Sequence, residues 1–213
     1  MILILLAFLP FCSKKPSQDV FPFQQPMAES MRFQLAVYLL PRPAHDPAAA
    51  LRKALAGQHA QVKPVAELPT EPREPLIYAH LQKNVRQKYR PPSLEYLGHA
   101  AHGLSHEQAE GLQKSEQAFI LEFAHPKQNV WTALKTANTV VEEIARRTGG
   151  LVWDEETREV FSPDAWHQTR LASWTAEIPN VSSQTVIHIY KNDDYVRAIS
   201  LGMAKMGLPD VVV

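Results

Sequence analysis

The sequence predicts an α+β fold, with an antiparallel or mixed sheet and helices packed mainly on one of its faces. Segments with apolar residues at alternate positions, which are typical of strands, are interleaved with segments of helical periodicity. In the second half of the chain, pairs of strand-like segments flank short polar turns and predict antiparallel hairpins. A long amphipathic helix near residues 126–148 has an apolar stripe that the face of a sheet would cover.

The first half of the chain predicts one clear strand and one clear helix. Residues 33–40 alternate apolar and other side chains, and two prolines follow the strand closely. Asp46 then caps a helix, with Pro47 at the first position, where the missing N–H costs nothing. We expect two further strands, at residues 61–65 and 76–81, joined by a proline-rich connection.

The middle of the chain predicts a short helix, a strand and the longest helix. Residues 105–108 have the pattern of a capping box, which opens a helix that runs to Lys114. A mostly apolar strand follows at residues 118–124. The helix at residues 126–148 ends at two glycines. Its apolar stripe consists of Val130, Leu134, Ala137, Val141 and Ile144.

Two hairpins and one short helix are expected after the long helix. Residues 151–153 and 158–161 flank a polar turn and predict the first hairpin. Ser162 is a suitable cap for a short helix that has proline at its first position and runs to about residue 169. Residues 185–190 and 196–200 predict the final hairpin.

The N-terminal residues 1–12 predict a signal peptide that ends in a lipid-attachment cysteine. Met1–Phe11 is apolar or nearly so, and it is too short for a membrane span of about 20 residues. Cys12 follows directly and is expected to carry the lipid, which would place the domain on the periplasmic side of a bacterial membrane. No Lys or Arg precedes the apolar run, and Phe11 occupies a position where a small residue is usual. An ordinary cleaved signal and a buried cytoplasmic segment are the alternatives.

The remaining chain is expected to form a tether and one domain. Residues 13–31 are rich in proline and glutamine and predict an extended tether, while residues 32–213 predict a single α+β domain. Cys12 is the only cysteine, so a lipidated protein would have no thiol chemistry. The chain has 22 basic and 22 acidic residues, which argues against a nucleic-acid partner.

Three closely spaced histidines are the best candidate metal ligands. His99, His102 and His106 have spacings of three and four residues, which on one helix face would suit zinc or copper. Gly103 and the cap residue Ser105 interrupt that helix, so solvent-exposed loop histidines are the other interpretation. We expect no cofactor apart from this possible zinc.

A second candidate site lies in a loop-rich region that contains two tryptophans. Trp166, His167, Arg170 and Trp174 predict a surface for a ligand or a partner protein. The acidic run at residues 154–156 is interpreted as a solvated hairpin turn rather than a catalytic carboxylate pair, and Asp193 with Asp194 is interpreted in the same way. No catalytic residue is assigned.

Two motifs resemble bacterial domains of unknown function. The first is the series Thr148–Glu159, which contains Gly-Gly-Leu-Val-Trp-Asp-Glu-Glu-Thr-Arg-Glu and is followed by Trp166. The second is Leu201–Asp210, which reads Leu-Gly-Met-Ala-Lys-Met-Gly-Leu-Pro-Asp, with Met206 where Phe is commoner. The resemblance covers roughly residues 95–213 and implies no activity, so no functional residue is transferred from it.

The sequence favours a non-enzymatic, lipid-anchored envelope protein that binds another envelope or secreted protein. An accessory subunit and an immunity-type inhibitor both fit this description. The chain lacks a nucleophile-elbow pattern, a phosphate loop, a dinucleotide-binding glycine pattern and a Cys-x-x-Cys pair. The alternatives are a metal-dependent hydrolase built on the three histidines and a small-ligand binding domain.

Overall fold

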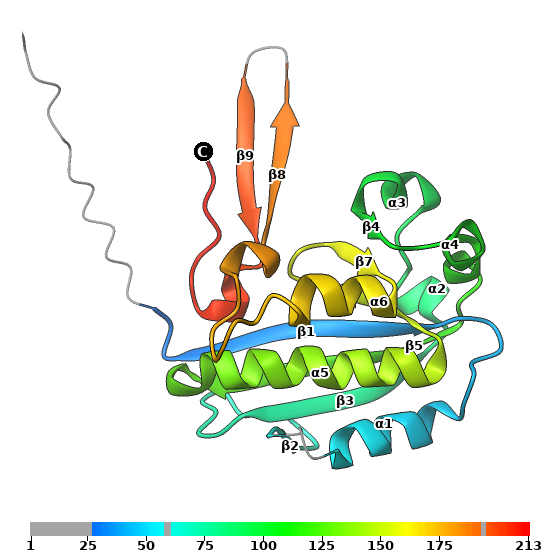
Figure 1. Cartoon of the computed structure of the whole chain (residues 1–213), viewed down its shortest axis with the longest axis horizontal. Coiled ribbons are helices and arrows are strands. Elements are labelled where there is room, and N and C mark those ends of the chain that lie inside the picture. The colour runs from blue at the N-terminus through cyan, green and yellow to red at the C-terminus, as the bar shows by residue number, and fades with distance from the viewer. Residues whose placement is uncertain (1–26, 58–60, 193–194) are drawn as a thin grey trace, which may run out of the picture.

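A computed structural model describes residues 27–57, 61–192 and 195–213 of the chain (Figure 1). The predicted signal peptide with Cys12, residues 13–26 of the predicted tether, and the turn aspartates Asp193 and Asp194 therefore lie outside the described residues. The strands are β1 (Ser30–Leu39), β2 (Lys63–Pro64), β3 (Leu76–Lys83), β4 (Ala101–His102), β5 (Gln117–Pro126), β6 (Leu151–Asp154), β7 (Glu159–Phe161), β8 (Val186–Lys191) and β9 (Val196–Leu201). The helices are α1 (Pro47–Ala56), α2 (Val85–Lys88), α3 (Leu94–Ala100), α4 (His106–Gln113), α5 (Val130–Thr148) and α6 (Pro163–Trp166).

The main sheet is mixed and has the strand order β2-β3-β5-β1-β6-β7-β4. β1 lies at its centre and pairs antiparallel with β5 on one side and with β6 on the other. The only parallel pairs among the described strands are the short ones at the two edges, β2 with β3 and β4 with β7. The predicted α+β class, with a mostly antiparallel sheet, is confirmed.

One face of the sheet carries the larger apolar core and the two longest helices. α5 crosses this face, and α1 packs beside it (Figure 1). All five residues of the predicted stripe of α5 are buried in this core. The helix ends as expected, because Gly149 adopts the left-handed conformation with φ of 68°. α6 adds Trp166 to the same core.

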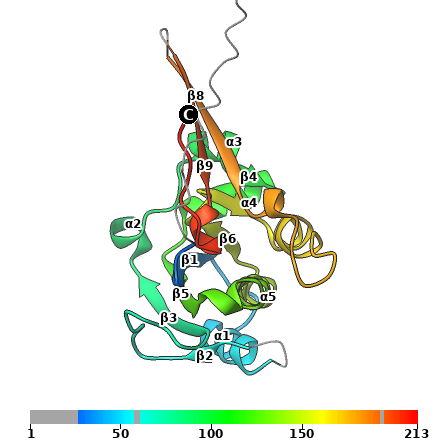
Figure 2. The same cartoon turned by 90° about the vertical axis from the view of Figure 1, so that its left-hand side faces the viewer.

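The opposite face carries a smaller core under three short helices. Val85 of α2, Leu97 of α3 and Leu112 of α4 pack on side chains from β1, β6 and β7. From the side, α2 and α5 lie on opposite sides of β1 and β5 (Figure 2). These helices were only partly predicted: the capping box of α4 at Ser105 is confirmed, whereas α2 and α3 were not expected.

A separate ribbon projects from the body of the molecule (Figures 1 and 2). We use the word ribbon for β8, β9 and residues 211–213, which pair along the outer side of β9. Ala198 and Val213 exchange two backbone hydrogen bonds of 2.8 and 2.9 Å, and the N–H of Ser200 donates to Val211 at 2.9 Å. The expected final hairpin is therefore present and carries a third extended segment.

The other local predictions agree with the structure only in part. The cap at Asp46 is confirmed, because its side chain accepts a hydrogen bond of 2.9 Å from the N–H of Ala49. The strand expected at residues 61–65 is reduced to the two residues of β2, next to a connection with several prolines. β1 begins at Ser30, inside the segment interpreted as a tether.

Within the described ranges, no helix is both long and apolar enough to span a membrane.

We expect Leu134→Ala in α5 to lower the free energy of unfolding by about 2–5 kcal/mol, because Leu134 is fully buried between helix and sheet. Thr132→Ala on the exposed side of the same helix should change it by less than about 0.5 kcal/mol. Urea unfolding followed by circular dichroism measures both effects. Equal effects of the two substitutions would contradict the assigned helix face.

Candidate functional site

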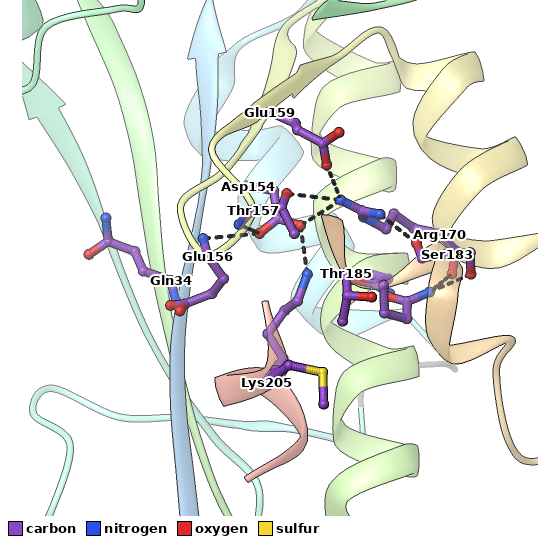
Figure 3. Close-up of polar contacts among 12 residues, drawn as sticks. Gln34, Asp154, Glu156, Thr157, Glu159, Arg170, Ser183, Thr185 and Lys205 are labelled. Carbon is purple, nitrogen blue, oxygen red and sulfur yellow. Dashed lines mark hydrogen bonds and ion pairs between the residues drawn. The ribbon is translucent and has the colours of Figure 1, made fainter. Parts of the chain in front are cut away.

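Four charged side chains meet in the interior near the base of the ribbon (Figure 3). We call Asp154, Glu159, Arg170 and Lys205 the ionic cluster. Lys205 Nζ lies 2.7 Å and Arg170 Nη2 lies 3.0 Å from the same oxygen, Oδ2 of Asp154. Arg170 Nη2 also lies 2.9 Å from Glu159 Oε2. Asp154, Arg170 and Lys205 are almost completely buried and Glu159 is 8% exposed, so these charges neutralise one another largely away from bulk water.

The members of the cluster come from segments far apart in the sequence. Asp154 ends β6 and Glu159 begins β7, so the first hairpin supplies both carboxylates. Arg170 lies in the π-helical turn η2 (His167–Leu171) that follows α6. Lys205 lies in the 3-10 helix η4 (Met203–Met206), directly after β9. The cluster thus joins the main sheet to the turn after α6 and to the segment that follows β9.

Asp154 also shapes the turn between β6 and β7. Its Oδ1 accepts hydrogen bonds from the N–H groups of Glu156 at 3.1 Å and Thr157 at 3.3 Å. This local pattern leaves the other oxygen, Oδ2, for the two cations. One aspartate therefore fixes both the hairpin turn and the position of the positive charges.

Arg170 is held by aromatic and amide groups as well as by carboxylates. Its guanidinium carbon lies 4.7 Å from the ring centre of Phe161 and 5.6 Å from that of Trp166. Its Nη1 donates to the carbonyl of Ser183, and its own carbonyl accepts a hydrogen bond of 2.9 Å from Gln184 Nε2. Residues 183–184 precede β8, so these contacts fix the start of the ribbon.

The cluster shifts the pKa values of its two carboxyl groups downward. Burial alone would raise the pKa of Asp154, but the charges of Lys205 and Arg170 outweigh it and hold that pKa below its usual range. Burial likewise opposes ionisation of Glu159, and the hydrogen bond with His102 and the charge of Arg170 lower its pKa. Both groups are therefore carboxylates at neutral pH.

A groove adjoins the outer side of the cluster. It has a cavity volume of about 550 Å³ and runs between α3 and the ribbon. Glu159 is the one member of the ionic cluster that lines it, and Arg158 lies beside Glu159 with Nη1 at 3.0 Å from Glu155. The other side chains that line the groove include Tyr96, His99, His188, Tyr190 and Leu201. The groove is thus an aromatic and histidine-lined surface with one exposed arginine.

The three candidate metal ligands are not brought together. His99 lies in α3, where its ring packs edge-on against Tyr96. His102 lies in β4 and contacts Glu159, with Nε2 at 2.8 Å from Oε1. His106 begins α4 and pairs with Glu110 at 3.2 Å. Among the residues that the structure describes, no group of three or more His, Cys, Asp or Glu side chains is placed to hold a metal ion.

The candidate tryptophan surface does not form as expected. Trp166 is 0% and Arg170 is 2% exposed, because both belong to the interior around the ionic cluster. Trp174 is partly buried and donates its indole N–H to the carbonyl of Arg170 at 2.8 Å. Of the four candidates, His167 alone is half-exposed, and it lies 3.0 Å from Glu142. The polar and loop-rich local sequence concealed that this segment packs against the sheet.

The acidic hairpin turn also differs from its interpretation as a solvated loop. Asp154 is fully buried, whereas Glu155 accepts hydrogen bonds from Tyr89 Oη at 2.7 Å and Trp153 Nε1 at 2.5 Å. Sequence reasoning did not identify Asp154, Glu159 and Lys205 as members of one ionic cluster with Arg170. The signal available was that Asp154 and Lys205 lie in the two motifs noted above, which meet here.

Comparisons of the chain with protein-family models, with curated proteins and with solved structures found no match. The resemblance to bacterial domains of unknown function stays a prediction from the two motifs. Function is therefore inferred from the geometry of this molecule.

We expect Asp154→Asn to lower the free energy of unfolding at pH 7 by about 3–5 kcal/mol, because Lys205 and Arg170 lose their shared carboxylate. A carboxyl group with a lowered folded pKa stabilises the fold above its unfolded pKa of about 4 and loses that effect as pH falls through the folded pKa. The wild type should therefore lose stability in acid, and the variant should lose less.

Urea unfolding at a series of pH values between 7 and 3 measures this difference. Glu177→Gln, at an exposed position, is the matched control and should follow the wild type. Parallel pH curves for Asp154→Asn and the wild type would contradict the assigned role of Asp154.

Proposed function

We propose that the chain is a lipid-anchored envelope protein that binds another protein through its ribbon and has no catalytic role of its own. The partner would be an envelope or secreted protein, with this chain acting as an accessory subunit or as an immunity-type inhibitor. The observation that carries the proposal is an exposed face of the ribbon on which four aliphatic side chains gather.

Strand register defines the apolar face. Ile187 lies opposite Ser200, Ile189 opposite Ala198, and Lys191 opposite Val196, so these side chains project to one side of the ribbon. Val211, which pairs with Ser200, projects to the same side. The exposed fractions are 67% for Ile187, 70% for Ile189, 62% for Val196 and 55% for Val211. We call this surface the apolar face of the ribbon.

Such a face supports a protein partner on energetic grounds. Monomeric soluble proteins rarely expose large contiguous apolar patches, and a projecting strand pair with aliphatic side chains invites association. Each buried CH₂ group contributes about 0.8 kcal/mol, so covering four aliphatic side chains would stabilise a complex substantially.

The ionic cluster gives no support to an enzyme. Asp154 and Lys205 are almost completely buried and bind one another, so a substrate has no access to either group. The hydrolase alternative loses support because its three histidines lie on separate elements. The small-ligand alternative loses support because Trp166 and Arg170 are core residues.

We expect Val196→Glu combined with Val211→Glu to reduce partner capture at least tenfold, because two charges would enter the apolar face. The measurement is affinity purification of the anchored protein from cross-linked detergent extracts, with quantitative mass spectrometry. Ile178→Glu, at an exposed apolar position outside the ribbon, is the matched control. Absence of a stoichiometric partner of the wild type would contradict the proposal.

We expect the protein from a membrane fraction to have the mass of a chain that begins at Cys12 and carries diacylglyceryl and acyl groups. This follows from the signal pattern at residues 1–12, since two or more acyl chains give stable anchoring. Intact mass spectrometry beside a Cys12→Ser variant, which should lack the lipid, checks it. An unmodified mass that begins at Met1 would contradict the anchor.

A further inference from the structure

The outer edge of β8 has backbone groups that no strand pairs with in the described part of the chain. On β9, Ala198 and Ser200 direct their backbone groups toward residues 211–213. The alternate residues of β9 therefore face β8, where their partners are Val186, His188 and Tyr190. It follows that the N–H and C=O groups of Ile187 and Ile189 point away from β9, at the outer edge of the ribbon.

The groove described above lies along this edge. Its lining includes the β8 residues from Val186 to Tyr190, and on the far side Tyr96 and His99 of α3. The cavity of about 550 Å³ gives an extended peptide room to lie beside β8. A strand added at such an edge gains main-chain hydrogen bonds for affinity and alternate side-chain contacts for specificity.

The two sides of an added strand would meet different surroundings. Side chains on one side would continue the apolar face beyond Ile187 and Ile189. Side chains on the other side would lie with His188 and Tyr190, whose rings stack with centres 6.3 Å apart, and would face the groove. The added strand therefore needs alternating chemistry, with apolar residues on one side and polar residues on the other.

The charges of this region favour carboxylates on the polar side. Arg158 lines the groove, and Arg197, which lies opposite Tyr190, projects to the same side of the ribbon as His188 and Tyr190. The carboxylate of Glu159 is already bound by Arg170 and His102. Glu155 pairs with Arg158, but the Arg158 side chain keeps 56% of its surface exposed. A second copy of β8 would bring His188 and Tyr190 to the polar side and no carboxylate, so charge favours an acidic partner.

We propose that the β8 edge binds an extended segment of the partner protein in which apolar and acidic residues alternate. This inference rests on the proposed function and specifies the form in which the partner is recognised. The segment adds as a strand beside Ile187 and Ile189, places its apolar side chains along the apolar face, and directs its carboxylates toward Arg158.

The test uses the full chain and a synthetic peptide with alternating valine and glutamate, acetylated and amidated at its ends. Hydrogen exchange with mass spectrometry reports on residues 186–191. At saturating peptide, exchange in this segment is expected to slow at least tenfold. The same peptide with lysine in place of glutamate should have no effect. Equal protection by both peptides, or none by either, would overturn the proposal.

Two variants distinguish main-chain pairing from side-chain contact. Ile189→Pro removes an N–H that faces outward and so spares the pairing with β9, and it should abolish protection. Ile189→Thr keeps the N–H, so the peptide should still protect this variant from exchange. Should the proline variant fail to fold, Arg158→Asn, which suits the positive φ of 61°, should weaken peptide binding about tenfold. Unchanged binding in Ile189→Pro or Arg158→Asn would overturn the proposal.

Failure of this inference is separable from failure of the proposed function. Protection of β8 that rises with protein concentration, without peptide, would mean that a second copy occupies the edge and would overturn the proposal. Capture of the natural partner that is lost in Val196→Glu with Val211→Glu but kept in Ile189→Pro would also overturn it, while leaving the protein-binding function intact.

Discussion

The shared carboxylate of Asp154 is the interaction on which the rest of the structure depends. One of its oxygens holds the turn between β6 and β7, and the other binds Lys205 and Arg170. Removing a partner from such a buried network leaves an uncompensated charge, which is more costly than losing a surface ion pair. The network holds the central sheet, the turn after α6 and the segment after β9 in one arrangement.

Local features of the fold were predictable from the sequence, and contacts between distant segments were not. The caps at Asp46 and Ser105 depend on hydrogen bonds to residues three positions away, so their patterns are visible in the chain. The stripe of α5 is visible because helical periodicity repeats over 19 residues. By contrast, α2 has four residues, which is too few for a periodic signal.

The burial of Arg170 is the clearest example of what the sequence could not reveal. Its neighbours Trp166 and His167 belong to a segment that is locally polar and loop-like, which favoured an exposed surface. Its actual environment is supplied by Asp154 and Glu159, which lie more than ten positions away. The burial of a charged side chain is decided by such partners, which a single sequence does not pair. The exposure of the apolar residues of the ribbon was also not predictable. Alternation of apolar residues predicts a strand, but it does not tell whether the apolar face packs on the core or stays exposed to solvent.

The hydrogen bonds of Gln184 attach the start of the ribbon to the body of the molecule. Its side-chain oxygen accepts from Asn138 of α5 at 3.1 Å, and its side-chain nitrogen donates to Arg170 at 2.9 Å. Lys205 fixes the other end of the same hairpin to Asp154. A hairpin clamped at both ends cannot detach by fraying from its base, so opening it requires breaking contacts inside the body. The base of the ribbon and the sheet therefore belong to one cooperative unit, and a load applied at the tip is transmitted into the core.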